Sequence, residues 1–283
     1  MTRTPQHAVR PGSPAAVVSG LCIYPIKSAG GLALTAGALD DRGLALDRRW
    51  MLVDQRGVAL TQRQFPSLRL VTPVLEGEGL RVSAPGMPEV RVPGRPDGPA
   101  RPVTLWDQAI AVRAVSAAVS AWFSAYLQHP CELVFMPDSS RRRRKDQLDG
   151  VLLSLSDGNP LHLISEASLA DLNRRLAQPV DHWRFRPNLV VGGSAAYDED
   201  YWRRVRIAGI DFDVVESCAR CGIVNVDAQG RGTGPVLRTL GRYRRWGPYI
   251  PFGQHLNHRR AGTLRVGDAL EVVERGDEPN ASG

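Results

Sequence analysis

The chain has 283 residues and a formal net charge of +7 at neutral pH, from 36 basic and 29 acidic side chains. A hydrophobic fraction of 43% and a charged fraction of 23% are typical of a globular protein with one large or two ordinary domains. Its 4 cysteines are too few for a disulfide framework, so we expect reduced thiols and a cytoplasmic location. No apolar run is long enough to span a membrane, and residues 1–10 lack the apolar core of a secretory signal.

The first half of the chain predicts mostly strands. Residues 1–16 are rich in Pro, Ser, Ala and Arg and are expected to form a loose tail. The stretch 84–102, with many Pro and Gly residues, predicts loops or edge strands. A helix is predicted from Ser116 to a stop at Pro130, because Val119, Trp122, Phe123, Tyr126 and Leu127 share one face. Short apolar stretches between Gly-rich turns predict strands at residues 17–24, 49–54 and 68–72.

The second half returns to strands after a basic loop. The densest basic cluster, residues 141–145, has no interleaved aromatic residue to stack on single-stranded bases, so we predict a solvated loop and no nucleic-acid binding. A helix follows with Ser165 as its N-cap. Strands are predicted at residues 131–136, 189–191, 205–215, 223–226 and 264–273, with a turn at 227–230. The pattern indicates an α+β, β-rich chain with a partly closed barrel and a domain boundary near residues 137–150.

Two cysteines, Cys218 and Cys221, flank Arg220 between two predicted strands. A thiolate beside a guanidinium is an activated, soft sulfur, suited to binding a thiophilic metal or to reacting. A thioredoxin-like dithiol requires its first cysteine at a helix N-terminus, whereas the residues after Cys221 predict a strand. A zinc site requires two more ligands, and the spacing of His255 and His258 is shorter than in zinc fingers. The other thiols, Cys22 and Cys131, lie in apolar strands and are predicted to be buried.

Three short motifs are candidates for binding an anion. Tyr24-Pro-Ile-Lys27-Ser28 ends a strand and enters a Gly-rich turn, where backbone amides and an ammonium can meet a phosphate. Asp47-Arg48-Arg49-Trp50 opens the next strand, and Phe185-Arg186-Pro187-Asn188 precedes a later one. Each motif alone is more often a surface charge or a turn. Together with a soft thiolate, they indicate an anionic cofactor that carries a metal.

Ordered motifs along residues 17–273 give the chain a family resemblance. It resembles the MOSC-domain proteins with an N-terminal MOSC β-barrel domain, among them the mitochondrial amidoxime-reducing component and bacterial reductases of N-hydroxylated compounds. The resemblance implies a MOSC N-terminal β-barrel-like domain at residues 17–137 and a MOSC β-barrel domain with a few helices at 150–276. The motifs are Tyr24-Pro-Ile-Lys-Ser, Asp47-Arg-Arg-Trp, Thr61-Gln-Arg-Gln, Ile164-Ser-Glu-Ala-Ser-Leu-Ala-Asp-Leu-Asn, Phe185-Arg-Pro-Asn, Cys218-Ala-Arg-Cys, Phe252-Gly-Gln-His and Gly262-Thr-Leu-Arg-Val-Gly-Asp268.

The resemblance also implies a molybdenum cofactor, a pterin dithiolene with a terminal phosphate. Cys221 would be the thiolate ligand of molybdenum, whereas Cys218 matches a cysteine that does not bind the metal. Asp157 matches an acidic residue near the metal and is a candidate proton relay. Gly158 and Asn159 stand where the amidoxime reducers carry two hydroxyl residues, so the pterin contacts and substrate preference are expected to differ there. The other cofactor-binding residues implied are Lys27, Ser28, Arg48, Arg186, Asn188 and Arg220.

The implied activity is reduction of hydroxylamines, amidoximes and N-hydroxylated bases at molybdenum. The 4 scattered cysteines do not fit a plant-type iron–sulfur cluster, so the electrons must come from an external ferredoxin- or cytochrome-type protein and its reductase. No membrane anchor is expected. Two other classes remain open. A cofactor carrier or sulfur-transfer protein would use Cys221 as a persulfide or transient ligand, and a β-rich binding module with a structural thiol would hold no metal.

Overall fold

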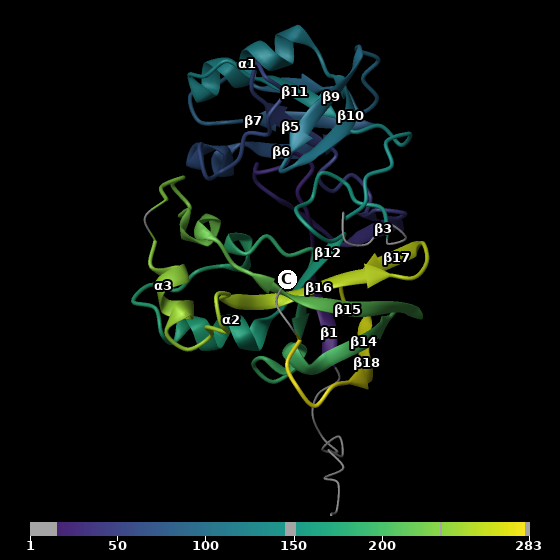
Figure 1. Cartoon of the computed structure of the whole chain (residues 1–283), viewed down its shortest axis with the longest axis vertical. Helices are drawn as coiled ribbons and strands as arrows, with labels where there is room; N and C mark the ends of the chain where they lie inside the picture. Colours follow the sequence, from purple (N-terminus) through teal and green to yellow (C-terminus); the bar gives the residue numbers. More distant parts are fainter. Residues whose placement is uncertain (1–15, 145–150, 233, 281–283) are drawn as a thin grey trace, which may run out of the picture.

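The computed structural model describes residues 16–144, 151–232 and 234–280, which form two lobes stacked along the longest axis (Figure 1). The predicted tail therefore lies, except for Ala16, outside the described residues, as do residues 145–150 of the predicted boundary loop. Within these described ranges, no helix is both long and apolar enough to cross a membrane.

The lower lobe is a closed barrel. Seven strands follow one another in the order β13-β12-β16-β15-β14-β18-β1, and pairing of β1 with β13 closes the ring. Only the neighbours β12 and β13 run parallel within this ring. The barrel strands are β1 (Ala16–Ile23), β12 (Leu161–Ser165), β13 (Leu189–Gly192), β14 (Trp202–Ile207), β15 (Ile210–Ala219), β16 (Pro251–His258) and β18 (Ala269–Arg275). Beside it lie β2 (Leu32–Leu34), which extends the sheet, and a small sheet of β17 (Gly262–Arg265), β3 (Ala36–Asp40) and β4 (Gly43–Leu44).

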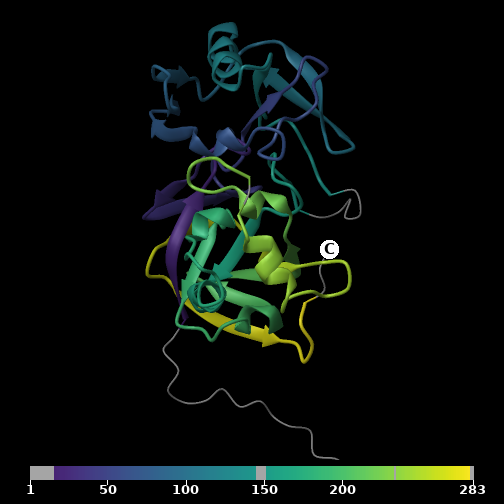
Figure 2. The ribbon, with the colours of Figure 1, turned by 90° about the vertical axis from the view of Figure 1, so that its left-hand side faces the viewer.

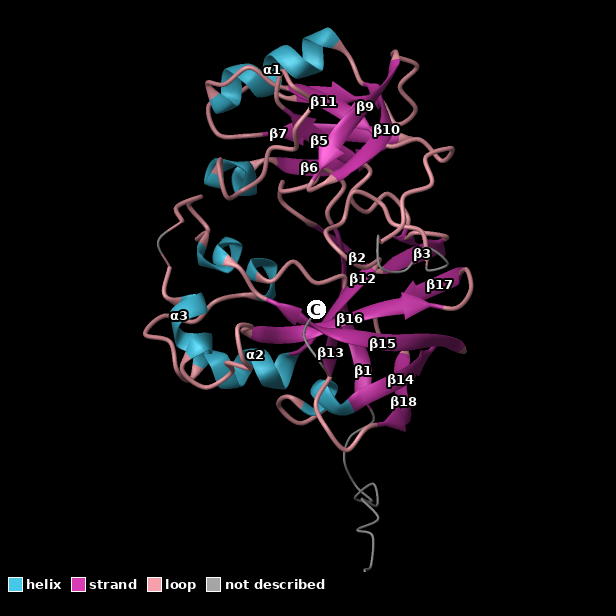
Figure 3. Ribbon diagram, in the orientation of Figure 1, coloured by secondary structure: helices cyan, strands magenta, loops and turns pink. Residues whose placement is uncertain are grey.

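Apolar side chains that alternate along the strands fill the barrel. Trp202, Val205 and Phe212 are almost fully buried inside it, as expected where inward and outward residues alternate on every strand. On one side, helices α2 (Glu166–Asn173) and α3 (Val236–Gly241) cover the barrel (Figure 3). Short 3₁₀ helices η2 (His182–Arg184), η3 (Asp198–Tyr201) and η4 (Gly222–Asn225) lie in the connections.

The upper lobe has its own sheets and its own core (Figure 2). Helix α1 (Ala117–Leu127) begins at the N-cap Ser116, whose side chain accepts a hydrogen bond from the Val119 amide, as predicted. The four-stranded sheet is β5 (Trp50–Val53), β11 (Glu132–Phe135), β10 (Gln108–Ala114) and β9 (Ala100–Leu105), and the three-stranded one is β6 (Thr72–Glu76), β7 (Gly79–Ser83) and β8 (Val90–Val92).

The β-rich fold class is confirmed, and several element predictions are wrong. Residues 68–72 lie mostly in the 3₁₀ helix η1 (Pro66–Leu70), and residues 223–226 lie mostly in η4. The single strand predicted over 205–215 is a hairpin of β14 and β15, because Ala208 and Gly209 turn with positive φ (50° and 71°) inside a continuous apolar pattern. The strand predicted over 264–273 is likewise two strands, β17 and β18.

The segment between the lobes differs from the predicted solvated loop. Arg142 is buried and donates hydrogen bonds to the carbonyl oxygens of Ser154 (2.7 Å) and Ser156 (2.6 Å). Arg144 forms an ion pair with Glu216 at 2.5 Å. The prediction is therefore wrong for these two arginines, which bind polar groups between the lobes.

Strands β1, β2 and β3 pair with strands of the lower lobe, although they precede the upper lobe in sequence. The lower lobe is therefore built from two parts of the chain, strands β1 to β4 and the residues from β12 onward, and the upper lobe lies between them in sequence. The domain boundary at residues 137–150 remains a prediction.

Gly253 allows β16 to lie close to β12. Its φ is +83°, and a Cβ there would lie 2.5 Å from both the Leu163 carbonyl oxygen and His162 Nε2. We expect Gly253→Ala to lower the free energy of unfolding by about 2–5 kcal/mol, from left-handed strain plus overpacking. Urea unfolding measures this change. Gly86→Ala is the control, because Gly86 has a φ of +76° but nothing within 4 Å. Equal losses in the two variants would contradict the steric argument.

Candidate functional site

A cavity of about 280 Å³ between the lobes is lined by all ten residues predicted for the site. They come from segments far apart in sequence, mostly just before or after strands β1, β5, β12, β13 and β15. The residues are Lys27, Ser28, Arg48, Asp157, Gly158, Asn159, Arg186, Asn188, Arg220 and Cys221.

The backbone is strained around this cavity. Ser28, Arg48, Arg186 and Trp106 line it with φ values of 68°, 49°, 55° and 57°. Non-glycine residues with positive φ cost energy and cluster at functional sites, where the surrounding structure holds them in place. The four strained residues therefore indicate that this cavity is a functional site.

Two guanidinium groups that line the cavity lie over one aromatic ring. Arg48 and Arg186 lie 4.4 and 4.2 Å from the ring centroid of Tyr24. Arg48 pairs with Asp47 and donates to Asn188 Oδ1 (3.1 Å). Arg186 donates to the Ala29 carbonyl oxygen (2.6 Å), and no carboxylate in the described ranges pairs with it. Burial and the neighbouring Arg48 lower the pKa of Arg186 to about 10, so it remains a cation at neutral pH.

Lys27 and Asp157 form an ion pair at the cavity wall, with Nζ and Oδ1 2.5 Å apart. The lysine is buried, whereas the aspartate side chain is 59% exposed. Burial raises the pKa of Asp157, but Lys27, Arg63 and Arg48 outweigh it and hold that pKa well below its usual range. Asp157 is therefore an ionised hydrogen-bond acceptor at neutral pH.

The two cysteines have different surroundings. Cys218, buried near the end of β15, accepts a hydrogen bond from Arg220 Nη1 at 2.9 Å. Burial raises the pKa of Cys218, but Arg220, His255 and His162 lower it well below the usual value, which favours the thiolate. Cys221 is partly exposed in the cavity, and its Sγ lies 3.4 Å from Arg63 Nη2. Arg220 thus contacts the buried sulfur, and Arg63 contacts the accessible one.

The surroundings of the cysteines also bear on the thioredoxin-like and zinc alternatives. Cys221 precedes the 3₁₀ helix η4, so the strand predicted after it is wrong. Cys218 lies on a strand, which still differs from a thioredoxin-like dithiol. His258 Nε2 donates a hydrogen bond to the Asp40 carbonyl oxygen, 2.6 Å away. Across the described residues, no group of three or more His, Cys, Asp and Glu is arranged to hold a metal ion alone. Cys22 is buried as predicted, whereas Cys131 is only partly buried.

Sequence reasoning missed a polar cluster beside the cysteines. Glu216 Oε1 lies 2.5 Å from Arg144 Nη1, 2.6 Å from Asn159 Nδ2 and 3.1 Å from His255 Nδ1. Burial lowers the pKa of His255, but Cys218 and Glu216 outweigh it and raise the pKa to about 9. The sequence indicated His255 only through the zinc alternative and as the last residue of the Phe252-Gly-Gln-His motif, without a catalytic role. Arg63 belongs to the Thr61-Gln-Arg-Gln motif. This motif contributed to the family resemblance, but the sequence assigned no function to Arg63.

Comparison with known proteins identifies the family. The family model "MOSC N-terminal beta barrel domain" matches residues 15–130, and "MOSC domain" matches 152–271. Rat mitochondrial amidoxime reducing component 2 is 34% identical over 89% of this chain and 82% of that protein. Human mitochondrial amidoxime-reducing component 1 is 31% identical over 90% of this chain and 82% of that protein. Molybdenum cofactor sulfurase from rice is 32% identical over 85% of this chain but 32% of that protein. The resemblance is confirmed: the chain belongs to the MOSC-domain proteins with an N-terminal MOSC β-barrel, the family of the mitochondrial amidoxime-reducing components.

Proposed function

We propose that the protein is a molybdenum-cofactor-dependent oxidoreductase that reduces N-hydroxylated compounds with electrons from an external donor protein. One observation carries the proposal: an accessible thiol, Cys221, lies in the same cavity as the buried Lys27 and the partly buried Arg186, which has no carboxylate partner in the described ranges. A soft sulfur binds a thiophilic metal, and partly buried guanidinium groups bind an anion. The names of the rat and human relatives support amidoxime reduction. The cytoplasmic location stays a prediction.

The polar groups present fit a pterin cofactor. Ser156 Oγ, Asn159 Oδ1 and Arg220 Nε are buried at the cavity and lack hydrogen-bond partners among the residues described. Buried polar atoms without partners are rare and indicate an absent ligand or water. Cys221 would hold the metal. Lys27, Ser28, Arg48, Arg186, Asn188 and Arg220 would hold the pterin and its phosphate.

When bound, the cofactor would supply the chemistry that removes oxygen from an N–O bond. This reduction consumes two electrons and two protons. The protein must orient the substrate and deliver the protons. Asp157 is ionised at neutral pH and accepts hydrogen bonds, but its lowered pKa makes it a weak base, so it would orient a proton donor and would not itself carry the proton. His255, with its pKa raised to about 9, is protonated at neutral pH and suits the donor role.

Elemental analysis and an activity assay test the proposal together. We expect about one molybdenum per chain and reduction of benzamidoxime to benzamidine by a reduced viologen dye. Protein that holds molybdenum yet fails to reduce amidoximes, hydroxylamines and N-hydroxylated bases would contradict it. Protein without any metal after expression in a host that makes the cofactor would favour a simple binding module.

Cofactor carriage or sulfur transfer is the second candidate. The lowered pKa of the Cys218 thiol, close in sequence to the accessible Cys221, and the similarity to the rice sulfurase favour it. A carrier would release its cofactor to an apo-enzyme within minutes and show no turnover. Tight retention of molybdenum with turnover would exclude that role.

A further inference from the structure

A run of arginines without acidic neighbours follows the two cysteines in sequence. No Asp or Glu occurs between Asp227 and Asp268. Three arginines of this run, on α3 and in the turn that follows it, are exposed: Arg238, Arg242 and Arg245. None of the three has a hydrogen-bond or ion-pair partner among the residues that the structure describes. We call these three residues the α3 arginine face.

Arginines at the end of α2 and an exposed aromatic residue extend this face. Helices α2 and α3 lie on the same side of the barrel (Figure 3), and the Arg175 guanidinium lies 4.2 Å from the ring centroid of Tyr243. The side chains of Arg174 and Arg175 are 68% and 47% exposed, whereas their carboxylate partner, Asp171, is only 12% exposed. In the turn after α3, Tyr249 is also exposed. Arginine and tyrosine side chains with little opposing charge are typical of protein interfaces.

Helix α3 packs against the segment that carries Cys221. Cys221 is the N-cap of η4, and Asn225 at the end of η4 accepts a hydrogen bond at Oδ1 from the Leu237 amide of α3 (3.0 Å). Val224 of η4 and Leu240 of α3 are fully buried in one apolar cluster. A protein docked on the α3 arginine face would therefore be separated from the thiol only by α3 and η4. Because the rate of electron transfer falls steeply with distance, this placement suits a redox partner.

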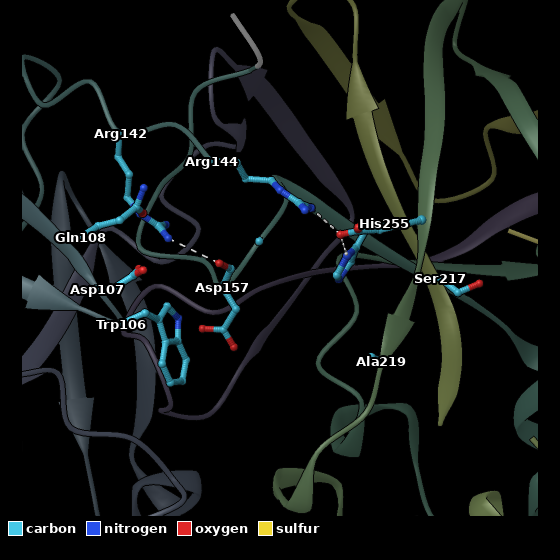
Figure 4. Close-up of a pocket in the computed structure, with 11 residues that line it drawn as sticks. Trp106, Asp107, Gln108, Arg142, Arg144, Asp157, Ser217, Ala219 and His255 are labelled. Atoms are coloured by element: carbon cyan, nitrogen blue, oxygen red, sulfur yellow. Dashed lines mark hydrogen bonds and ion pairs between the residues drawn. The ribbon is translucent and has the colours of Figure 1, made fainter. Parts of the chain in front are cut away.

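A second cavity, of about 360 Å³, adjoins the first between the lobes and has a different charge pattern (Figure 4). Its lining includes the carboxylates of Asp107, Asp157 and Glu216. Its two arginines, Arg142 and Arg144, donate to the Asp157 carbonyl oxygen (3.4 Å) and to the Glu216 carboxylate (2.5 Å). An acidic protein would gain little attraction from these groups. The arginines of the α3 face have no such partners in the described ranges, so they attract a negative charge more strongly.

We propose that the α3 arginine face is the docking surface for the electron-donor protein, and that this partner is an acidic protein with a one-electron redox centre. This inference rests on the proposed function. Carboxylates of the partner pair with Arg238, Arg242 and Arg245, and these opposite charges steer the encounter and fix its orientation. The redox centre of the partner then lies over α3 and η4. Each reduced partner gives up one electron and leaves oxidised, so two successive encounters supply the two electrons that cleave the N–O bond.

Binding of a plant-type ferredoxin tests the surface without turnover. This acidic protein with one [2Fe–2S] centre is the probe, and calorimetry measures its binding to the purified protein at an ionic strength of about 0.01 M, where screening is weak. The face variant combines Arg238→Glu, Arg242→Glu and Arg245→Glu. It should bind the ferredoxin about tenfold more weakly than the wild type, or weaker still. Reduction of benzamidoxime by reduced ferredoxin should fall in parallel, whereas reduction by the small viologen dye should not change.

The control variant carries the same change in net charge on the upper lobe. It combines Arg56→Glu, Arg91→Glu and Arg95→Glu, at arginines whose side chains are 85%, 83% and 83% exposed. It should bind the ferredoxin nearly as the wild type does, and thermal unfolding shows whether each variant is folded. Equal losses of binding in the two folded variants would show attraction by net charge alone and would overturn the inference.

The remaining outcomes separate the docking surface from the proposed function. A wild type that does not bind the ferredoxin, whether or not it binds phosphatidylserine vesicles or single-stranded DNA, would also overturn the inference. Binding that is lost only in the face variant, without turnover by either donor, would refute the reductase and leave the docking surface standing. Turnover by ferredoxin that is equal in the wild type and the face variant would refute only the surface.

Discussion

Cys221→Ser is expected to abolish molybdenum binding and to lower benzamidoxime reduction by about a hundredfold or more. An alcohol is a harder and far less acidic ligand than a thiol, so it does not replace a thiolate on a soft metal. Cys221 is the partly exposed sulfur of the first cavity, and Arg63 Nη2 lies 3.4 Å from it. The exchange keeps the size of the side chain nearly constant, so the fold should remain intact.

Two other cysteines serve as controls in the same experiment. Cys218→Ser should retain molybdenum, because that sulfur is buried against Arg220. Cys131→Ser, in the upper lobe beside Ser124, should behave as the wild type. Metal content is measured by elemental analysis and folding by circular dichroism. Full activity of Cys221→Ser, or loss of metal only in Cys218→Ser, would reassign the ligand.

The residues that line the first cavity could be predicted because they belong to short motifs with a local chemical meaning. Lys27, Arg48 and Arg186 lie at strand ends, where charged side chains and turns are conspicuous in the sequence. Their convergence could not be predicted, since it depends on the closure of the barrel and the packing of the two lobes. The strained φ values of Arg48 and Arg186 are likewise set by this packing.

Glu216 and His255 escaped prediction for a different reason. The pairing of β15 with β16 shifts register between Val214 and Glu216 and again between Ser217 and Ala219. Each shift changes which side of the sheet the following side chains lie on. Simple alternation along the strand therefore predicts the wrong side of the sheet for these residues. Trp106 lies at a hairpin turn with no glycine or asparagine to mark it. Nothing local in the sequence indicates that Trp106 lines a cavity together with residues of the lower lobe such as Ala219 and His255.

His255 is expected to make the stability of the protein depend on pH in the alkaline range. Burial lowers its pKa, but the Cys218 thiolate and Glu216 outweigh burial and raise it from 6.5 to about 9. Because the folded state binds this proton more tightly than the unfolded state, the contribution is complete below pH 6.5 and is lost as the pH rises through about 9. At about 1.4 kcal/mol per pKa unit, the rise from 6.5 to about 9 amounts to at most about 3.5 kcal/mol.

His255→Gln should therefore be less stable than the wild type at pH 6 and should approach it above about pH 9. Urea unfolding across this range measures the difference, with His129→Gln in the upper lobe as the control. In the wild type, the His255 imidazole should titrate by NMR with a midpoint near 9. Cys218→Ala should lower that midpoint, because it removes the thiolate that helps to hold the proton. A wild-type midpoint at or below 6.5 would show that burial outweighs both anions, and His255 would then be neutral in the cavity at physiological pH.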